Sequence, residues 1–532
     1  MSSALEVLPA DALPDEPARA CWPRAESRDG AEPPGDASLA DGIVLLLVLT
    51  IPQRLIGFCR NVLFCRLLEP DQLGEWNLAF NMLLIGAPLI VLGLPGSFGR
   101  YVEHYRQRNQ LRTFLRRTTA ASLLLAATGI GLLALLHEPL SWLIFADRSQ
   151  TDVFAVALLA LAAVVSFNFL VELLTALRQV RAVSLMQLAN SLIFAVVAVT
   201  LLVTTALGAR GILLGYAAAC LLTSAAAGWR LRGWITARQE EAPLTQFELW
   251  RKLAPFAAWL WVSDLLMNLF SAVDRYMIMH FCCGGPQEAA ALVGHYHSSR
   301  VVGDLLVGMS IMLGAMVLPY LSHDWESGRR RAVSQRLNLT LKLTAVGMSW
   351  LCGLVLVGAP LLFDWALGGK YANGREVLPW MLICCIWFGM ILLAKCYLWC
   401  AERARLVSCL ILTGLLTNAV LNLLWLPRWG LWGAVLATAV SHAVVLVLVF
   451  AASRLLGARQ DGRVWLACAL PACLSLGTGP ALALLVAVTW LGVSRGWLFS
   501  RREVRDLKTL FTDQWHGLRG RGGHRSSNPW PE

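Results

Sequence analysis

The sequence predicts an all-α polytopic membrane protein with about fourteen transmembrane helices. Of its 532 residues, 57% are hydrophobic and only 15% are charged, whereas soluble domains carry about 25% charged residues. Apolar stretches of bilayer-spanning length recur along the chain, and Lys and Arg gather in alternate loops between them. This composition excludes an ordinary cytosolic enzyme and a disordered or nucleic-acid-binding scaffold, so no nucleic acid partner is expected.

The expected spans follow one another from residue 41 to residue 499. They are 41–66, 76–99, 114–136, 152–177, 182–206, 211–229, 253–280, 293–321, 338–363, 377–400, 406–426, 430–452, 464–477 and 480–499. The last two are short for full crossings, because a membrane helix needs about 20 residues, and Gly477, Gly479 and Pro480 form the expected turn between them.

The distribution of basic residues tests this count. Alternate loops, within 100–117, 178–181, 230–252, 329–342, 403–405, 454–463 and 495–525, hold most of the Lys and Arg. The opposite loops hold only Arg148, Arg210, Lys370, Arg375 and Arg428. Basic loops stay in the cytoplasm, so both termini are expected there, and the net charge of +11 is mainly a topology signal.

Composition and span count divide the chain into six regions. Residues 1–40 are rich in Pro and acids and are expected to be a disordered cytoplasmic tail. We expect an N-terminal six-helix lobe over 41–229, a basic cytoplasmic linker over 230–252 and a C-terminal six-helix lobe over 253–455. A helix pair over 464–499 and a basic cytoplasmic tail over 500–532 complete the chain.

Two short motifs repeat at nearly the same spacing. Residues 73–76 (LGEW) correspond to 293–296 (VGHY), and 210–212 (RGI) correspond to 429–431 (WGL). The repeats suggest a duplicated six-helix unit. Because six is even, both copies insert in the same direction, and such parallel repeats enclose a substrate site between them.

The first span carries a polar strip in an otherwise apolar helix, formed by Gln53, Arg54, Gly57, Arg60 and Asn61. A charge at the middle of a bilayer costs about 3 kcal/mol or more, so these arginines need a partner or a watery cavity. We favour a site for a phosphate-bearing ligand, since a guanidinium matches phosphate oxygens. The alternative is intramembrane pairing with an acid. Arg66, near the end of the span, is assigned to snorkelling.

Acidic side chains within the spans are the candidate ion-coupling groups. Asp264, Asn268, Ser271 and Arg275 share one helical face, with Asp274 adjacent. His297, Arg300 and Asp304 follow in the eighth span, and Glu172 lies on a strip with Asn168, Thr175 and Gln179. Either these groups tie helices together, or a carboxylate exchanges its cationic partner for a proton or sodium ion. Lys395 lies in the tenth span. It either contacts a ligand or pairs with an acid, and the sequence favours neither interpretation.

Several activities lack their usual sequence features. No phosphate-binding loop of the form GxxxxGK[ST] is present, so an ATP-driven pump is not expected. The outer loops are too short for a catalytic domain, and no Cys-x-x-Cys pair lies beside matched His residues. We therefore expect no enzyme activity, no catalytic residues, no metal site and no bound cofactor.

Motifs in both halves together resemble those of polysaccharide flippases. The run 66–76 (RLLEPDQLGEW) resembles the signature that opens these proteins. Further motifs lie at 87–89, 92–95, 273–276, 293–296, 318–322, 422–427 and 430–438. The chain thus resembles the O-antigen and teichoic-acid export family (Wzx-like oligosaccharide-lipid exporters) of the multidrug/oligosaccharidyl-lipid/polysaccharide (MOP) superfamily, over about 45–455.

This resemblance implies a V-shaped transporter of the bacterial inner membrane with a central cationic cavity. It implies flipping of an undecaprenyl-diphosphate-linked oligosaccharide, with Arg54, Arg60 and Arg300 in places comparable to those of embedded arginines in a related flippase. We expect alternating access, with these arginines and Lys395 as substrate-binding residues. Coupling to H⁺ or Na⁺ would use Asp264, Asp274, Asp304 and Glu172. The implied partners are the lipid-linked oligosaccharide and membrane lipids, with a glycan polymerase and glycosyltransferases as further candidates. The long acidic N-terminus departs from the family.

Three alternative functions differ from this one in the features that they require. A multidrug exporter of the same superfamily (MATE type) carries cationic cargo, which the midspan arginines disfavour. A lipid II flippase shares embedded arginines and stays an alternative. A membrane glycosyltransferase or glycan polymerase needs a large extramembrane loop, which the sequence lacks.

Overall fold

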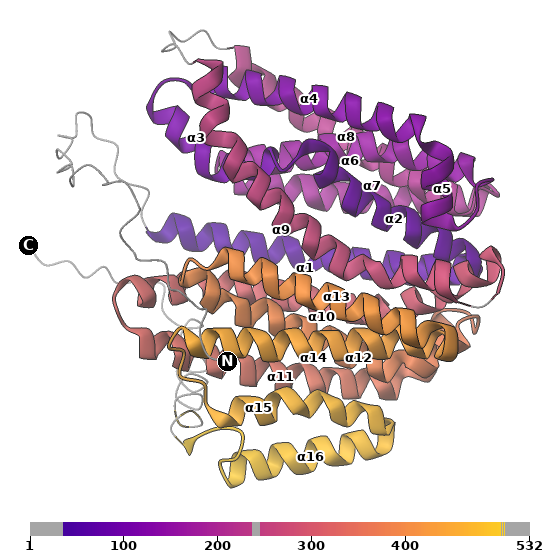
Figure 1. Ribbon diagram of the computed structural model, residues 1–532, viewed down its shortest axis with the longest axis vertical. Helices are drawn as coiled ribbons and strands as arrows, with labels where there is room; N and C mark the ends of the chain where they lie inside the picture. Colours follow the sequence, from indigo (N-terminus) through magenta and orange to yellow (C-terminus); the bar gives the residue numbers. More distant parts are fainter. Residues whose placement is uncertain (1–35, 237–244, 283, 502, 504, 506–532) are drawn as a thin grey trace, which may run out of the picture. The chain divides into compact units, whose positions relative to one another are not determined.

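The protein folds into sixteen α-helices over the residues that the structure describes, which are 36–236, 245–282, 284–501, 503 and 505 (Figure 1). The structure is a computed structural model. In chain order the helices are α1 (Asp36–Leu67), α2 (Pro70–Val91), α3 (Phe98–Gln107), α4 (Leu111–Leu135), α5 (His137–Phe145), α6 (Thr151–Ala176), α7 (Val180–Thr204), α8 (Ala209–Thr236), α9 (Gln246–Phe281), α10 (Pro286–Glu326), α11 (Arg330–Pro360), α12 (Ala372–Cys400), α13 (Ala404–Trp429), α14 (Leu431–Leu455), α15 (Gly462–Ala469) and α16 (Thr478–Ser494). A 3₁₀ turn, Pro95–Ser97, precedes α3; a π-helical turn, Leu361–Ala366, follows α11; and a 3₁₀ segment, Leu470–Leu476, follows α15.

The all-α polytopic prediction is confirmed. Among the described residues, 11 helices are long and apolar enough to cross a membrane, and α1 coincides with the first expected span. The expected final pair forms shorter apolar helices, Gly462–Leu476 and Thr478–Gly492. At 1.5 Å per residue, the 17 residues of α16 extend about 25 Å, less than the hydrocarbon thickness of about 30 Å.

The second span is shifted toward the N-terminus from its expected position at 76–99. Pro70 opens α2, as proline suits the first helical position. The helix ends at Val91 because Leu92 and Gly93 adopt left-handed backbone conformations, with φ of 49° and 68°. Pro95 then starts a separate turn. Residues 92–99 therefore do not continue the span.

The predicted tails and linker lie largely outside the described residues. Of the expected tail 1–40, residues 1–35 are outside, and α1 begins at Asp36. Of the expected linker 230–252, the C-terminal end of α8 reaches Thr236 and α9 begins at Gln246, with 237–244 outside. Of the tail 500–532, only 500, 501, 503 and 505 are described. The six-region division stays a prediction.

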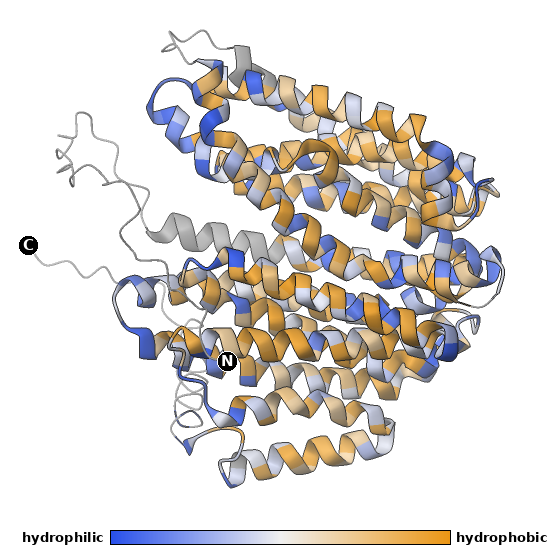
Figure 2. Ribbon diagram, in the orientation of Figure 1, coloured by the Kyte–Doolittle hydropathy of each residue, from blue (hydrophilic) through white to orange (hydrophobic). Residues whose placement is uncertain are grey.

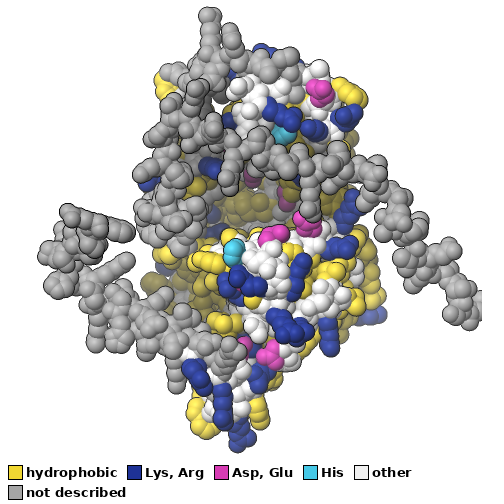
Figure 3. All heavy atoms as spheres, turned by 90° about the vertical axis from the view of Figure 1, so that its left-hand side faces the viewer, with side chains coloured by type: hydrophobic (Ala, Val, Ile, Leu, Met, Phe, Trp, Pro, Cys, Tyr) yellow, Lys and Arg dark blue, Asp and Glu magenta, His cyan; other side chains and the backbone are white. Residues whose placement is uncertain are grey.

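The outer surfaces of the helices are apolar, as expected for a protein that is surrounded by lipid. Large apolar side chains such as Leu124, Leu135 and Leu354 are mostly exposed, and a soluble protein rarely exposes so much contiguous apolar surface. Hydrophobic residues run along the helices, while hydrophilic residues gather at their ends (Figure 2). One end face carries many Lys and Arg side chains (Figure 3).

The two copies of the proposed repeat meet in a reciprocal contact between α2 and α10. A Cβ at Gly74 would overlap the carbonyl oxygen of Ala290, and a Cβ at Gly294 would overlap that of Pro70. One turn further on, Asn77 Nδ2 lies 2.8 Å from His297 Nδ1 in a buried pair. Asn77 and His297 are 220 residues apart, as are Gly74 and Gly294, and Pro70 and Ala290. Equivalent positions thus face each other, as expected for a pseudo-twofold axis.

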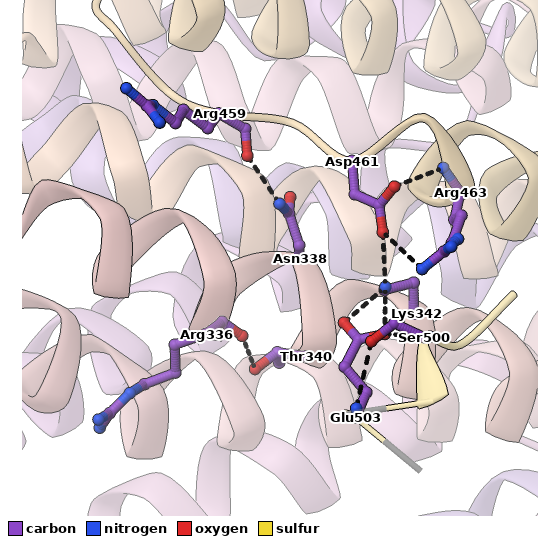
Figure 4. Close-up of polar contacts among 9 residues, drawn as sticks. All are labelled: Arg336, Asn338, Thr340, Lys342, Arg459, Asp461, Arg463, Ser500 and Glu503. Carbon is purple, nitrogen blue, oxygen red and sulfur yellow. Dashed lines mark hydrogen bonds and ion pairs between the residues drawn. The ribbon is translucent and has the colours of Figure 1, made fainter. Parts of the chain in front are cut away.

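A buried lysine holds the C-terminal helix pair against α11. The ammonium of Lys342, whose side chain is fully buried, lies 3.1 Å from Asp461 Oδ2 and 2.7 Å from Glu503 Oε1 (Figure 4). Asp461 caps α15, and Glu503 lies beyond α16. Two carboxylates around one ammonium satisfy the buried charge. Lys342 is therefore a buried residue that anchors the helix pair, and not one of the loop residues whose charges indicate topology.

Candidate functional site

A polar pocket lies where α1 and the following helices of the first repeat meet α10. Its volume is about 310 Å³, and its wall is built from α1, α2, α6, α7, α8 and α10. The polar strip of α1 faces it, because Gln53, Arg54, Gly57, Arg60 and Asn61 all line the pocket. These positions recur at three- and four-residue intervals, which places them on one helical face.

Arg60 lies against an aromatic wall and forms no ion pair with a described residue. Its guanidinium carbon is 4.1 Å from the ring centroid of Phe194 and 5.9 Å from that of Phe64. Its Nε atom is buried without a hydrogen-bond partner among the described residues. The π-face of Phe194 gives the cation some stabilisation, but the guanidinium keeps unused donors within the pocket.

Arg54 reaches across the pocket from α1 to α10. Its guanidinium packs against Gly308, where an added Cβ would lie 3.3 Å from the guanidinium carbon. The absence of a side chain at Gly308 leaves room for this cation. Within the described part of the chain, neither Arg54 nor Arg60 forms an ion pair. Two guanidiniums without acidic partners therefore face one pocket.

Arg300 is engaged with a carboxylate. Its Nε lies 2.8 Å from Asp304 Oδ1, one helical turn away on α10. The Arg300 side chain is 10% exposed, whereas that of Asp304 is 44% exposed and lines the pocket. The charges of this pair offset each other, so the pocket keeps the positive charge of Arg54 and Arg60. The structure thus brings Arg54, Arg60 and Asp304 to one pocket, with Arg300 behind Asp304.

Lys395, Asp264 and Glu172 lie elsewhere. Lys395 on α12 is buried, and its ammonium is 4.8 Å from the ring centroid of Trp399. Asp264 on α9 interacts electrostatically with Lys395 and with Glu172 on α6, but no ion pair joins Asp264 to Lys395 among the described residues. Thus none of the three lines the pocket of Arg54 and Arg60.

Asp274 is enclosed in a separate hydrogen-bond network in the second repeat. Its Oδ2 accepts hydrogen bonds of 2.8 Å from Tyr296 Oη and from Thr438 Oγ1. Its Oδ1 accepts hydrogen bonds from Asn418 Nδ2 at 2.9 Å and Asn422 Nδ2 at 2.8 Å. The residue is 1% exposed, and the four donors on α10, α13 and α14 satisfy both of its oxygen atoms.

One atom of this network has no partner. Asn422 Oδ1 is buried and accepts no hydrogen bond from the described residues. With the Asp274 carboxylate and the Thr438 hydroxyl, it adds to a set of oxygen atoms, which is the ligand type that hard cations prefer. The described residues contain no group of three or more His, Cys, Asp and Glu that could hold a metal.

Sequence reasoning missed the α7 and α8 walls of the pocket and the donors to Asp274. On α7, Gln187, Asn190, Ser191 and Phe194 line the pocket, and their three- and four-residue spacing could have revealed them as a polar strip. Of the donors, Tyr296, Asn422 and Thr438 all fall within the family motifs already noted. The motifs contain these three donors, but the sequence alone does not show that they contact Asp274.

The fold of this chain is similar to the folds of solved membrane transporters. A structure titled lipid II flippase MurJ, inward closed conformation, is similar with a TM-score of 0.63 and 13% identity, covering 84% of this chain and 92% of that one. An inward-facing multidrug resistance MATE family transporter of the MOP superfamily gives a TM-score of 0.53 and 11% identity, covering 80% and 98%. At these identities the similarity establishes the fold alone.

Sequence comparison identifies the family. Residues 39–325 match the family described as polysaccharide biosynthesis protein, and the chain belongs to this family. A curated relative, the uncharacterized membrane protein YabM of Bacillus subtilis (strain 168), is 28% identical over 214 residues. That match spans 40% of this chain and 40% of the length of YabM.

Proposed function

We propose that the protein is a flippase that translocates a polyprenyl-diphosphate-linked oligosaccharide across the bacterial inner membrane for surface polysaccharide biosynthesis. The observation that carries the proposal is the pair Arg54 and Arg60, two guanidiniums without acidic partners that line one pocket of the membrane-embedded bundle. Membership of the polysaccharide biosynthesis family supports the same class of substrate.

A diphosphate matches this pocket in charge and in geometry. Charged groups within a bilayer cost several kcal/mol unless they meet a counter-charge or water, and a phosphate group supplies the counter-charge. Guanidinium groups bind phosphate oxygens through paired N–H donors. The unused Nε of Arg60 provides one such donor. The polyprenyl chain stays in the surrounding lipid while the headgroup occupies the pocket.

Translocation follows an alternating-access scheme. The face with many Lys and Arg side chains (Figure 3) is assigned to the cytoplasm by the positive-inside rule, with both termini on that side. The headgroup enters from the cytoplasm, and relative movement of the two repeats releases it outside. The protein acts as a transporter and not as an enzyme, and polymerases or glycosyltransferases are candidate partners that supply or consume the cargo.

We assign coupling to H⁺ or Na⁺ to the Asp274 network. A buried carboxylate with amide and hydroxyl groups around it, and the unpartnered Asn422 Oδ1, supports binding of a small cation. Asp304 contributes differently, because it is paired with Arg300 and faces the pocket. Asp264 and Glu172, which interact near Lys395, remain second candidates for proton transfer, and Lys395 for substrate contact.

The decisive experiment replaces the pocket arginines. We expect Arg54→Ala and Arg60→Ala each to reduce flipping of a fluorescent undecaprenyl-diphosphate oligosaccharide in proteoliposomes at least tenfold, because each loses a charge-assisted phosphate contact. Arg66→Ala is the matched control: Arg66 is on the same helix but donates to the Trp365 carbonyl oxygen, outside the pocket. Flipping at the control rate by both pocket variants would rule out the assignment.

A second experiment tests the coupling site. Asp274→Asn keeps the size of the side chain but removes its charge, so we expect flipping to lose its dependence on an imposed Na⁺ or H⁺ gradient. The matched variant is Asp264→Asn on the same helix. A gradient dependence that survives at Asp274→Asn and disappears at Asp264→Asn would transfer the coupling role to Asp264.

A lipid II flippase is the second candidate, favoured by the structural similarity to MurJ. Lipid II also presents a diphosphate, so the arginines alone do not separate the two. Competition of lipid II with the oligosaccharide substrate in the same proteoliposomes does. The MATE-type alternative is not supported, since cationic cargo would meet Arg54 and Arg60.

A further inference from the structure

We propose that the pocket also contains a binding site for the first sugar of the cargo, formed by carboxamide and aromatic side chains next to the arginines. This inference rests on the proposed function and adds to it the part of the headgroup that the pocket recognises. Gln53, Asn61 and Gln187 supply the carboxamides, while Phe58, Phe80 and Phe167 supply the rings.

These three carboxamides have no hydrogen-bond partners among the described residues. The side chains of Gln53, Asn61 and Gln187 form no hydrogen bond with another described residue, although they lie in a membrane-embedded region where polar groups are costly. Each carboxamide offers both a donor and an acceptor, and so does each sugar hydroxyl. Pairing with a sugar would therefore satisfy both.

The neighbouring polar side chains on α7 are positioned by contacts with other helices. Asn190 Nδ2 lies 3.4 Å from Cys220 Sγ and from Thr223 Oγ1 on α8, and Ser191 Oγ lies 3.5 Å from the Gln53 carbonyl oxygen on α1. These contacts fix the α7 wall against α1 and α8. Gln187, one turn before Ser191, is left facing the pocket without such a tie.

The aromatic side chains divide into two groups. Phe194 is 2% exposed, and its ring is taken by the Arg60 guanidinium. Phe58, Phe80 and Phe167 are only partly buried and line the pocket, and Phe80 also packs against Trp76 and Tyr216. The exposed part of each ring can contact the C–H surface of a pyranose ring. Phe194 thus contacts the guanidinium that we assign to phosphate binding, whereas the other three rings border the part of the pocket that we assign to the sugar.

The charge and size of the pocket restrict the ligand. Asp304 is the one acid in its lining and is paired with Arg300, so the carboxamide wall suits neutral hydroxyl or acetamido groups beside the diphosphate. A volume of about 310 Å³ is at the lower end of the range for small-molecule sites, about 300–1,000 Å³. The pocket therefore takes the sugar attached to the diphosphate rather than the whole oligosaccharide.

The test compares three lipids on the full-length protein in nanodiscs. The probes are undecaprenyl diphosphate, the same lipid bearing one glucose, and the same lipid bearing one N-acetylglucosamine. We expect the wild type to bind at least one sugar-bearing probe more tightly than the sugar-free one. Gln187→Ala and Asn61→Ala should each weaken sugar-bearing binding about three- to tenfold, the range of one lost hydrogen bond.

The sugar-free lipid separates the possible failures. Its affinity should be unchanged in Gln187→Ala and Asn61→Ala, which also shows that these variants are folded, and reduced in Arg60→Ala. Thr200→Ala, an exposed position on α7 outside the pocket, is the matched control. The sugar site is overturned if the wild type does not prefer either sugar-bearing probe, or if the carboxamide variants weaken all probes equally or none. Failure of the wild type to bind undecaprenyl diphosphate at all would instead overturn the proposed function.

Discussion

The contact between α2 and α10 and the pocket beside Arg54 and Arg60 are built from the same two repeats in opposite ways. At the first, two glycines let helix backbones touch, and the buried polar pair, Asn77 and His297, is satisfied. At the second, guanidiniums and carboxamides surround an open volume without internal partners. The first region is organised for protein contacts and the second for a ligand, so substitutions should affect stability in one and binding in the other.

The largest effect should come from filling the glycine contact. Gly74→Leu places a side chain where the Ala290 carbonyl oxygen lies, and Gly294→Leu does the same at Pro70. Because backbone cannot move aside as a side chain can, each change should destabilise the protein by about 3 kcal/mol, the upper part of the range for overpacking, measured by thermal unfolding in detergent.

A double variant tests whether the two glycines belong to one contact. Since both glycines belong to one contact, the double variant should cost clearly less than the sum of the single changes. Gly131→Leu on α4 is the control, as an added Cβ there meets nothing within 4 Å. Additive effects, or equal losses at Gly131, would show that close approach of α2 and α10 is not what the glycines provide.

An intermediate effect of opposite sign is expected in the pocket. Arg60→Met removes a cation that lacks an acidic partner but keeps an apolar contact with Phe194. Because an uncompensated charge is costly in a bilayer, the variant should gain about 1 kcal/mol in stability, seen as a higher unfolding temperature, while losing diphosphate binding. A lower unfolding temperature would mean that Arg60 serves the fold and would weaken the contrast between the two regions.

The smallest effect concerns the polar pair. Asn77→Ala leaves the buried His297 Nδ1 without its partner and should cost about 1 kcal/mol, with sugar-lipid binding unchanged. The comparison is Asn81→Ala on the same helix, whose amide donates only to Asn77. Unfolding temperature and binding affinity of the two variants decide whether the contact between the repeats needs the hydrogen bond or only the glycines.

The sequence predicted the elements well because hydropathy acts locally. A run of about twenty apolar residues must form a helix in lipid, since unpaired backbone groups cost several kcal/mol there. The polar strip from Gln53 to Asn61 follows from helical periodicity in the same way, and the structure places it on one pocket wall. Errors arose at ends such as Leu92 and Gly93, where backbone conformation stopped α2 before the apolar run ended.

The site was less predictable because its partners come from distant segments. The sequence places Asp274 within a predicted span, but Asn418 and Thr438, 144 and 164 residues away, cannot be connected to it by spacing. Lys342 was counted with loop residues, although Asp461 and Glu503, 119 and 161 residues away, hold it inside the protein (Figure 4). In both cases, partners from distant segments of the chain determine the role of the buried charged residue.

By itself, the sequence determined a membrane-spanning all-α chain with a repeated unit and a helix that carries two intramembrane arginines, because length, hydropathy and periodicity act over one or two turns. Only the tertiary structure decided which charges are paired. Arg300 meets Asp304, Lys342 meets two carboxylates, and Arg54 and Arg60 are left facing a pocket. The physical reason is that the energy of a buried charge depends on what packing brings within a few ångströms of it, which the order of residues along the chain does not specify.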